Sequence, residues 1–309
     1  MKFLLYCFVL ILIPGFVIAQ TPTDSIPVIT INCKLIGKDS VIIPFDKHYS
    51  IVQDNCAEII RYGHYDFKNK TFVGRFRDVK KYDTTQIVAE GSYANGLKEG
   101  LFVLHYLDGK LMAKGTFKHD KYDGDWTIYY PNGSLSGKGS FKDNKFVGKW
   151  ELYYDNGKPK LFFDVEKSVC KILNAWSPDD VKIVNEGDGT YQTESSAHWA
   201  GRLSNGLPDS TWIYYKGAND KDGTVLEYFK QNKFVRGHTD AVVVDQDYTN
   251  ASHISLLPQL PRIEIDVAQY LSISPACNGI EYSKVYIKMF NKIYLEKKIL
   301  LPGAKGLRN

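Results

Sequence analysis

Three glycines, Gly91, Gly115 and Gly139, stand 24 residues apart, and the residues that follow each of them keep the same order. The three copies are GSYANGLKEGLFVLHYLDGKLMAK (91–114), GTFKHDKYDGDWTIYYPNGSLSGK (115–138) and GSFKDNKFVGKWELYYDNGKPKLF (139–162). A fixed period of this length indicates a small supersecondary unit that buries its apolar face only by stacking on its neighbours. Such an array presents a long surface instead of a cleft, which favours binding over catalysis.

Each copy carries a two-residue hairpin signal at the same place: Asp108-Gly109, Asn132-Gly133 and Asn156-Gly157. These dipeptides favour type I′ turns, because both central residues of such a turn need a positive φ. We therefore predict two antiparallel strands per copy. The residues expected to face one another next to these turns are Tyr106 and Leu111, Tyr130 and Leu135, and Tyr154 and Pro159. The second turn of each copy is expected near Asn95-Gly96, His119-Asp120 and Asp143-Asn144.

Strand alternation divides the side chains of each copy between two faces. One face is expected to carry Phe102, Leu104 and Tyr106, then Trp126, Ile128 and Tyr130, then Trp150, Leu152 and Tyr154. In this register Phe102 lies opposite Gly115, and Trp126 lies opposite Gly139. An aromatic ring over a cross-strand glycine covers bare backbone, so we predict that each pair packs as one unit. The other face is mixed, which suits a solvated or partner-facing side.

The predicted fold is all-β, an elongated single-layer antiparallel meander of tandem β-hairpin repeats with a small α+β tail. The 21 Tyr, 16 Phe and 5 Trp support a β-rich chain, because aromatic side chains suit pleated surfaces. The expected segments are a signal peptide (1–19), an N-terminal β segment (20–61), the repeat array (62–165), an irregular connector (166–200), a second repeat segment (201–237), a linker (238–262) and a C-terminal α+β segment (263–309). In that last segment we expect a short helix over 263–273 and two strands around Asn291-Lys292.

The N-terminus has the pattern of a cleaved secretory signal. Lys2 precedes an apolar run, and Val17-Ile18-Ala19 provides a cleavage site that leaves Gln20 as the new end. The alternative is a retained membrane anchor, but the run of about 16 residues is shorter than the roughly 20 needed to span a bilayer. We therefore predict an exported protein, periplasmic or secreted, with membrane contact only through the uncleaved signal.

Four cysteines follow the signal: Cys33, Cys56, Cys170 and Cys277. An even number in an exported chain permits disulfides, and four cysteines allow three pairings. We favour a bridge between Cys33 and Cys56, which share the N-terminal segment. The alternative is four isolated buried thiols.

No residue pattern in the chain points to catalysis. The seven histidines include no HExxH pair, and no Cys/His spacing is typical of a metal site. The net charge of +4 is spread along the chain without a basic block, which excludes a nucleic-acid surface. We therefore expect a protein that is not an enzyme, with no cofactor, no metal and no nucleic-acid partner.

The order of Gly, Trp, Tyr-Tyr and Asn-Gly from Gly115 to Gly133, and again from Gly139 to Gly157, resembles the bacterial variant of the MORN repeat, a family often labelled antitoxin-like. The resemblance covers roughly 62–165 and 187–236. It implies a β-hairpin array with a binding or scaffolding role and no catalytic residues. An antitoxin role does not fit an export signal. In the tail, the residues around 268–280 and the alternating VYIKMF (285–290) resemble the opening of a TonB-type C-terminal domain.

The favoured function is that of an exported, non-catalytic module that binds or scaffolds a protein partner along the sheet. An alternative is binding of a cell-surface carbohydrate by the mixed face. The residues proposed for binding are His105, Tyr129, Tyr153 and Tyr214, although their rings could instead pack on sheet neighbours. A third hypothesis is a degenerate relative of TonB-like energy transducers that acts through the tail.

Overall fold

The computed structural model describes residues 28–217, 225–241, 244–259, 263, 267, 271, 286–290 and 292–295. The predicted signal peptide (1–19), Cys277 and most of the predicted helix over 263–273 lie outside the described residues. Of the residues that carry the TonB resemblance, only Leu271 and residues 286–290 are among those described. No helix in the described ranges is long and apolar enough to cross a bilayer.

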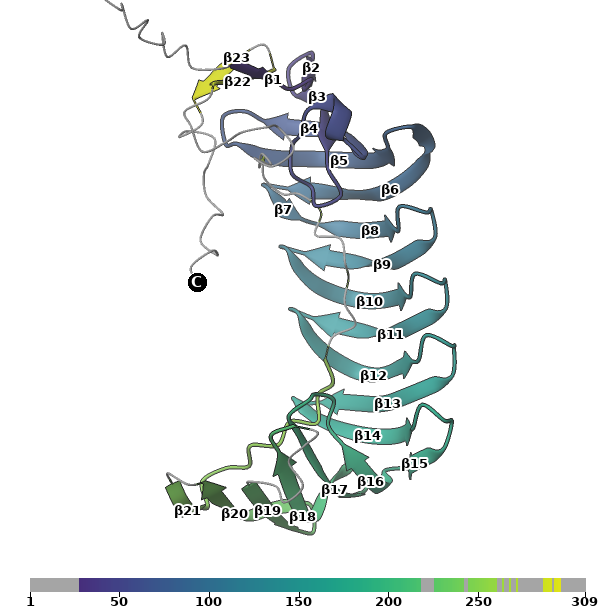
Figure 1. Ribbon diagram of the computed structural model, residues 1–309, viewed down its shortest axis with the longest axis vertical. Helices are drawn as coiled ribbons and strands as arrows, with labels where there is room; N and C mark the ends of the chain where they lie inside the picture. Colours follow the sequence, from purple (N-terminus) through teal and green to yellow (C-terminus); the bar gives the residue numbers. More distant parts are fainter. Residues whose placement is uncertain are drawn as a thin grey trace, which may run out of the picture.

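Twenty strands form one antiparallel sheet in which strands pair in chain order, apart from the short strand Leu97–Lys98, which is bypassed by pairing between the strands on either side of it (Figure 1). They are β2 (Lys34–Ile36), β3 (Ser40–Phe45), β4 (Ile59–Asp66), β5 (Thr71–Lys80), β6 (Asp83–Ala94), β7 (Leu97–Lys98), β8 (Gly100–His105), β9 (Leu111–Lys118), β10 (Lys121–Tyr129) and β11 (Leu135–Lys142). They continue with β12 (Lys145–Tyr153), β13 (Pro159–Glu166), β14 (Val169–Trp176), β15 (Lys182–Asn185), β16 (Asp188–Gln192), β17 (His198–Ser204), β18 (Leu207–Tyr215), β19 (Val225–Lys230), β20 (Lys233–Ala241) and β21 (Val244–Tyr248). Within the described residues no ladder joins β2 to β21, so the sheet is open. The predicted elongated meander is confirmed.

A second, small sheet joins the two ends of the described chain. Strand β1 (Val28–Thr30) pairs in parallel with β22 (Tyr286–Met289), and β22 pairs antiparallel with β23 (Lys292–Leu295). The backbone N–H of Ile31 also donates to the carbonyl of Lys288 at 2.9 Å. The two strands predicted near residue 291 are therefore present, and the N-terminal β segment supplies their partner.

Two segments that the sequence predicted to be irregular contain strands. Strands β14 to β16 and the start of β17 fall within the predicted connector at 166–200, and β21 and the end of β20 fall within the predicted linker at 238–262. The 24-residue period is lost in both places, but alternation of buried and exposed residues continues, as in Val169–Trp176. Pairing depends on this alternation and on short turns, not on the spacing of the glycines.

The turns after Asp108, Asn132 and Asn156 are not type I′ turns, which corrects the prediction. In each turn only the glycine has a positive φ, as with Gly109 at +91°. The N–H of Gly109 donates to the carbonyl of Tyr106, and the N–H of Tyr106 donates to the carbonyl of Lys110, both at 2.9 Å. This is a type I turn followed by a glycine bulge, so Leu111 pairs with His105 and not with Tyr106.

The type I′ turns lie at the opposite end of the hairpins. His119 and Asp120 have φ of 50° and 67°, and Asp143 and Asn144 have φ of 50° and 68°. Each pair closes a two-residue loop, because Lys118 pairs directly with Lys121 and Lys142 with Lys145. Asp and Asn tolerate the left-handed region, which explains their use without glycine.

The predicted register of rings and glycines is confirmed, but the predicted packing partner is not. Phe102 pairs with Gly115, and Trp126 pairs with Gly139. However, a Cβ added at Gly115 would overlap the indole of Trp126, so that ring covers the glycine of the preceding strand. The same holds for Phe102 over Gly91, Trp150 over Gly139 and Trp212 over Gly201.

A hydrogen bond explains which glycine each indole covers. The Nε1–H of Trp126 donates to the carbonyl of Thr116 at 3.0 Å, and that of Trp150 donates to the carbonyl of Ser140 at 2.9 Å. Each acceptor follows the covered glycine, so the indole leans toward the preceding strand. A buried indole N–H needs such an acceptor, and this fixes the side on which the ring lies.

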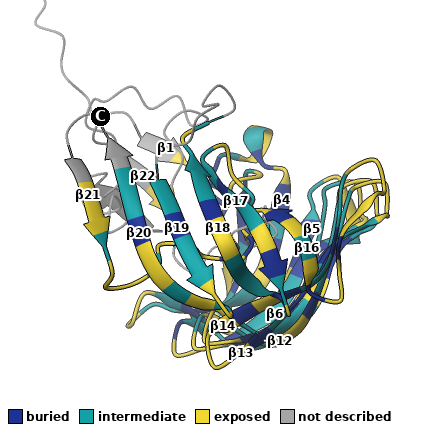
Figure 2. Ribbon diagram, turned by 90° about the horizontal axis from the view of Figure 1, so that it is seen from below, coloured by how far each residue is buried: buried dark blue, intermediate teal, exposed yellow. Residues whose placement is uncertain are grey.

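The buried rings form one continuous row along what we call the inner face of the sheet. Its members are Phe76, Phe102, Phe117, Trp126, Phe141, Trp150 and Phe163. Consecutive rings of this row contact one another or share Tyr122 or Phe146 between them. Buried, half-buried and exposed residues follow one another along each strand, as Figure 2 shows. Because the row of rings crosses successive strands, the hydrophobic core extends along the length of the sheet instead of filling a compact centre.

Past β21, the described residues 249–259, 263, 267 and 271 lie along the inner face, and we call them the return segment (Figure 1). The buried carboxylate of Glu227 fixes the start of the return segment. It accepts hydrogen bonds from the hydroxyl of Tyr248 and from the N–H of His253, both at 2.7 Å. Farther along, Leu256 is buried, and its carbonyl accepts a hydrogen bond from the Cys170 thiol at 3.6 Å. Val267 packs in the same core. The inner face is thus partly occupied by the chain itself.

An ion pair is buried at the N-terminal end of this core, and sequence reasoning did not find it. The guanidinium of Arg61 donates to both carboxylate oxygens of Asp78 at 2.8 Å, and neither side chain is exposed. The rings of Phe72 and Phe76 lie 4.6 and 4.4 Å from the guanidinium carbon. This bidentate contact pairs the two buried charges with each other.

The predicted disulfide between Cys33 and Cys56 is wrong. Cys33 and Cys170 are free thiols, both buried, whereas Cys56, at the end of the 3₁₀ turn η1 (Asp54–Cys56), is disulfide-bonded. Cys33 packs in the hydrophobic core instead. Burial raises the pKa of the Cys33 thiol to about 12. Burial, with a smaller contribution from Asp164, also raises the pKa of Cys170 to about 12.

We expect neither free thiol to react in the folded protein. At pH 8 both groups stay protonated, and only a thiolate is nucleophilic. Mass-spectrometric peptide mapping after iodoacetamide treatment should find Cys33 and Cys170 unlabelled in the native protein and labelled in denaturant. Cys56 should stay unlabelled in both samples unless a reductant is added. A peptide linking Cys33 to Cys56 would contradict this assignment.

Candidate functional site

The outer face, opposite the ring row, presents one line of side chains that crosses eleven strands. Cross-strand partners point to the same face, so the pairing identifies the members of this line. The outer row comprises Ile42, Tyr62, Arg77, Glu90, Val103, Lys114, Thr127, Lys138, Glu151, Phe162 and Asn174. Every member is half-buried or exposed. At ~4.8 Å per strand the row is about 48 Å long.

A second line on the outer face runs beside the glycine-bulge turns. It contains three of the four residues predicted for binding, His105, Tyr129 and Tyr153, and all three are half-buried. Their cross-strand partners are Leu111, Leu135 and Pro159. We call these six residues the aromatic row.

Tyr214, the fourth predicted binding residue, lies on the inner face. It pairs with Trp199, a core residue, with ring centroids 5.3 Å apart. Trp212 occupies the place of Trp126 in the repeat, so Tyr214 corresponds to the inward Ile128. The outward residue is Tyr215, which stacks on His198 at 5.2 Å.

Polar contacts hold the rings at the end of the aromatic row. The hydroxyl of Tyr153 donates to Glu151 at 2.5 Å, and Lys138 lies 2.9 Å from the same oxygen. The hydrogen bond from Tyr153 is the main cause that lowers the pKa of Glu151, and Lys138 adds to it. Burial, together with Glu151, raises the pKa of Tyr153 to about 12. Tyr153 is therefore a neutral, oriented ring with Phe162 5.9 Å away.

His105, the first residue of the aromatic row, lies in a less solvated environment. Its Nδ1 is buried and has no hydrogen-bond partner among the described residues. Burial lowers the pKa of this histidine, while Glu90 opposes that shift. The imidazole is therefore neutral near pH 7 and contributes an uncharged ring to the surface.

The tyrosines at the start of each glycine-bulge turn join one repeat to the next. The hydroxyl of Tyr106 donates to the carbonyl of Tyr129, and that of Tyr130 donates to the carbonyl of Tyr153, both at 2.8 Å. Tyr154 does the same to the carbonyl of Trp176. The predicted structural role of Tyr106, Tyr130 and Tyr154 thus has a concrete form: each satisfies a carbonyl one repeat farther along.

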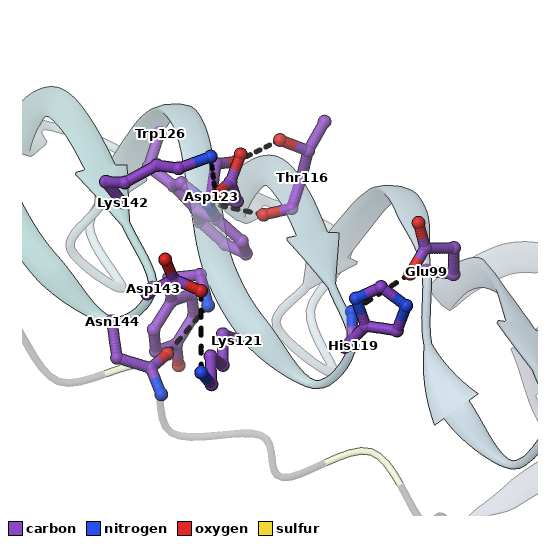
Figure 3. Close-up of polar contacts among 10 residues, drawn as sticks. Glu99, Thr116, His119, Lys121, Asp123, Trp126, Lys142, Asp143 and Asn144 are labelled. Atoms are coloured by element: carbon purple, nitrogen blue, oxygen red, sulfur yellow. Dashed lines mark hydrogen bonds and ion pairs between the residues drawn. The ribbon is translucent and has the colours of Figure 1, made fainter.

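The type I′ turns make a second set of links between repeats, shown in Figure 3. Lys142 lies 2.9 Å from the carboxylate of Asp123, and Lys121 lies 3.4 Å from that of Asp143. Asn144 accepts a hydrogen bond from the N–H of Tyr122 at 2.7 Å. Exposed ion pairs of this kind contribute little stability, so they align the hairpins but do not build a site.

The outer face has an open depression of about 770 Å³ near its N-terminal end. Side chains from β2 to β8 line it, including Ile36, Ile42, Tyr62, His64, Arg75, Arg77, Glu90, Ser92, Leu101 and Val103. Ile36 is 57% exposed, Tyr62 43% and Leu101 52%, which is unusual for large apolar side chains. The depression is continuous with the outer row, because Tyr62, Arg77, Glu90 and Val103 belong to both.

The charges around the depression are mainly positive. Arg75 is exposed and makes no ion pair or hydrogen bond within the described ranges. Arg77 has only a long contact, 3.7 Å, with Glu90. His64 Nδ1 lies 3.4 Å from a carboxylate oxygen of Asp39.

Sequence reasoning missed this depression because its walls come from segments as far apart as residues 36 and 103. One signal was present: Arg75 and Leu101 both follow a glycine at the same place in the repeat, where later copies have Asp125 and Lys149. No group of three or more His, Cys, Asp or Glu side chains in the described chain is placed to hold a metal ion.

A comparison with curated proteins finds no match to the chain. Family models give one result, and it falls on the hairpins whose geometry is set out above. Three consecutive segments of the sheet, residues 98–119, 122–143 and 146–161, match the MORN repeat variant.

Proposed function

We propose that this chain is an exported, non-catalytic repeat protein that binds a protein partner along the outer face of its sheet. MORN repeats are generally non-catalytic modules, which supports binding over chemistry. The observation that carries the proposal is the contrast between the two faces. The inner face carries the buried ring row and is partly covered by the return segment, whereas the outer row and the aromatic row leave half-exposed side chains in a regular order.

The composition of the outer face suits a protein partner. The outer row alternates apolar, cationic and acidic side chains, and the aromatic row beside it adds tyrosines with fixed orientations. Interfaces between proteins use aromatic residues and arginine as anchors, with charged residues at a polar rim. Export rests on the N-terminal apolar run and the cleavage site after Ala19.

Site-specific photo-crosslinking tests the proposed face. A benzophenone amino acid placed at Leu101, Tyr129 or Thr127 should give a discrete crosslinked product in the envelope or secreted fraction of the native host. The matched control is Tyr82, which is 81% exposed in the turn between β5 and β6 and belongs to neither row. Crosslinks at Tyr82 alone, or at none of the outer positions, would contradict the proposal.

Carbohydrate binding is a second candidate, favoured by one observation. Tyr129 and Tyr153 lie two strands apart on the same face with their rings half-exposed, an arrangement that can stack on sugar rings. Glycan-array binding that disappears in Tyr129→Ala and Tyr153→Ala, with the fold intact, would favour this candidate over a protein partner.

A further inference from the structure

We propose that the depression between β2 and β8 binds an extended peptide segment of the partner, in which acidic residues alternate with aliphatic ones. This inference rests on the proposed function and specifies which part of the outer face selects the partner. Three observations carry it: the exposed apolar side chains, the unpaired cation and the length of the depression.

The apolar component comes from three separate strands. Ile36 of β2, Tyr62 of β4 and Leu101 of β8 all line the depression and all remain substantially exposed. In a monomeric protein, large apolar side chains gathered in one hollow mark an interaction site more often than scattered ones do. Aliphatic side chains of a partner would remove this surface from water.

The cationic component selects an acidic ligand. Arg75 lines the depression with its guanidinium unpaired, and Arg77 beside it is held only by the 3.7 Å contact with Glu90. A guanidinium binds a carboxylate through two parallel hydrogen bonds, which gives direction as well as charge. The carboxylate of Glu90, which also lines the depression, and that of Asp39, 3.4 Å from the lining residue His64, disfavour a polyanion such as a nucleic acid and favour isolated carboxylates.

The length of the depression indicates an extended chain. Its lining residues come from β2, β3, β4, β5, β6 and β8, which are successive neighbours in the sheet. Five steps of ~4.8 Å give about 24 Å, the span of roughly seven residues in an extended peptide at ~3.3 Å per residue. Such a segment would lie across the strands, on the outer face, and not along an edge of the sheet.

The repeat itself supplies a matched control for this site. Arg75, Leu101, Asp125 and Lys149 each follow a glycine with positive φ, namely Gly74, Gly100, Gly124 and Gly148. Arg75 and Lys149 are therefore equivalent cations on the outer face, and both are exposed. Only Arg75 borders the depression.

The test measures fluorescence anisotropy of a labelled heptapeptide with the full chain. The probe has glutamates at its second, fourth and sixth positions and valine or leucine elsewhere. We expect saturable binding that weakens about tenfold in Arg75→Gln, the size expected for loss of a charged hydrogen bond. Lys149→Gln should bind as the unaltered protein does. The same peptide with glutamine in place of glutamate should also bind about tenfold more weakly.

A second pair of variants tests the apolar component. Leu101→Asp should weaken binding at least tenfold, whereas Val169→Asp, at an equally exposed position on β14, should not. Equal losses in Arg75→Gln and Lys149→Gln, equal binding of the glutamine peptide, or tighter binding of a seven-nucleotide single-stranded DNA would overturn the inference. If Leu101→Asp does not fold, the two exposed cation variants decide the outcome.

The two proposals fail in different ways. Crosslinks at Thr127 and Tyr129 without binding of the heptapeptide would refute the peptide site and leave the outer face as the partner surface. Binding of the heptapeptide that depends on Arg75, without any crosslink along the repeats, would refute the extended outer interface and keep the depression as a local site.

Discussion

Replacing Asp78 by alanine should lower the free energy of unfolding by about 3–5 kcal/mol, because the Arg61 guanidinium would remain buried without a counter-charge. Both hydrogen bonds between the two side chains, each 2.8 Å long, would be lost in one step. The surrounding rings, with Phe76 4.4 Å and Phe72 4.6 Å from the guanidinium carbon, cannot replace a carboxylate. Urea denaturation followed by tryptophan fluorescence measures the loss.

Two further variants show whether the loss of stability in Asp78→Ala comes from the unpaired buried charge or from substitution in general. The double variant Arg61→Met and Asp78→Leu should recover most of the lost stability, because replacing a buried ion pair by apolar side chains is often neutral. Glu90→Ala, which removes the long and exposed contact with Arg77, should change the unfolding free energy little. If Asp78→Ala were as mild as Glu90→Ala, the ion pair would not hold this end of the core.

Replacing Trp150 by alanine should also cost about 3–5 kcal/mol, the range for deleting a large buried ring. The indole contacts the rings of Phe141, Phe146 and Phe163, so its loss interrupts the ring row on the inner face. The backbone of Gly139 beneath it would be uncovered, and the carbonyl of Ser140 would lose its donor. Trp150→Phe should be milder, since Phe102 fills the same place in an earlier copy.

Gly139 provides the other half of a double-mutant cycle. Gly139→Ala should cost about 1–3 kcal/mol, because the new methyl group would overlap the indole of Trp150. In the Trp150→Ala background the same change should cost much less, and this coupling is the signature of a ring lying on a glycine. Gly217→Ala is the control, since nothing lies within 4 Å of a Cβ there. Equal costs of Gly139→Ala in both backgrounds would contradict the packing.

Local sequence patterns predicted the strands and their order, and the reason is physical. Alternation and turn residues act over a few positions, so they fixed the two faces around Trp126 and Trp150. They could not decide which neighbouring strand a ring covers, because Trp126 has a glycine on both sides, Gly115 and Gly139. That choice depends on the indole N–H reaching the carbonyl of Thr116. The predicted type I′ turns were wrong because Asn-Gly also suits a type I turn with a glycine bulge, and the dipeptide alone does not distinguish the two.

The candidate site was only partly predictable. Tyr129 and Tyr153 were placed on the outer face because their position in the repeat is unambiguous. In the later repeat the outward position was assigned to Tyr214 instead of Tyr215. Because side chains of a strand alternate between the two faces, an error of one residue moves the predicted side chain to the other face. The depression joins residues from different hairpins, and no local pattern encodes such contacts. Arg61 and Asp78 are cross-strand partners in the β4–β5 hairpin, which precedes the regular copies, so the repeat did not predict their register. Cys33 and Cys56 were paired by proximity in the sequence alone.

The tyrosine hydroxyls that reach from one repeat to the next make the sheet extensible in whole units. Because the hydroxyl of Tyr130 satisfies the carbonyl of Tyr153 just as Tyr106 satisfies that of Tyr129, an inserted copy of 24 residues would find both of its neighbours already complementary. The outer surface could therefore lengthen or shorten by gene duplication or deletion of single copies. The depression between β2 and β8 would be unchanged by such events. The length of the outer surface and the selectivity of the depression could therefore evolve independently in this protein.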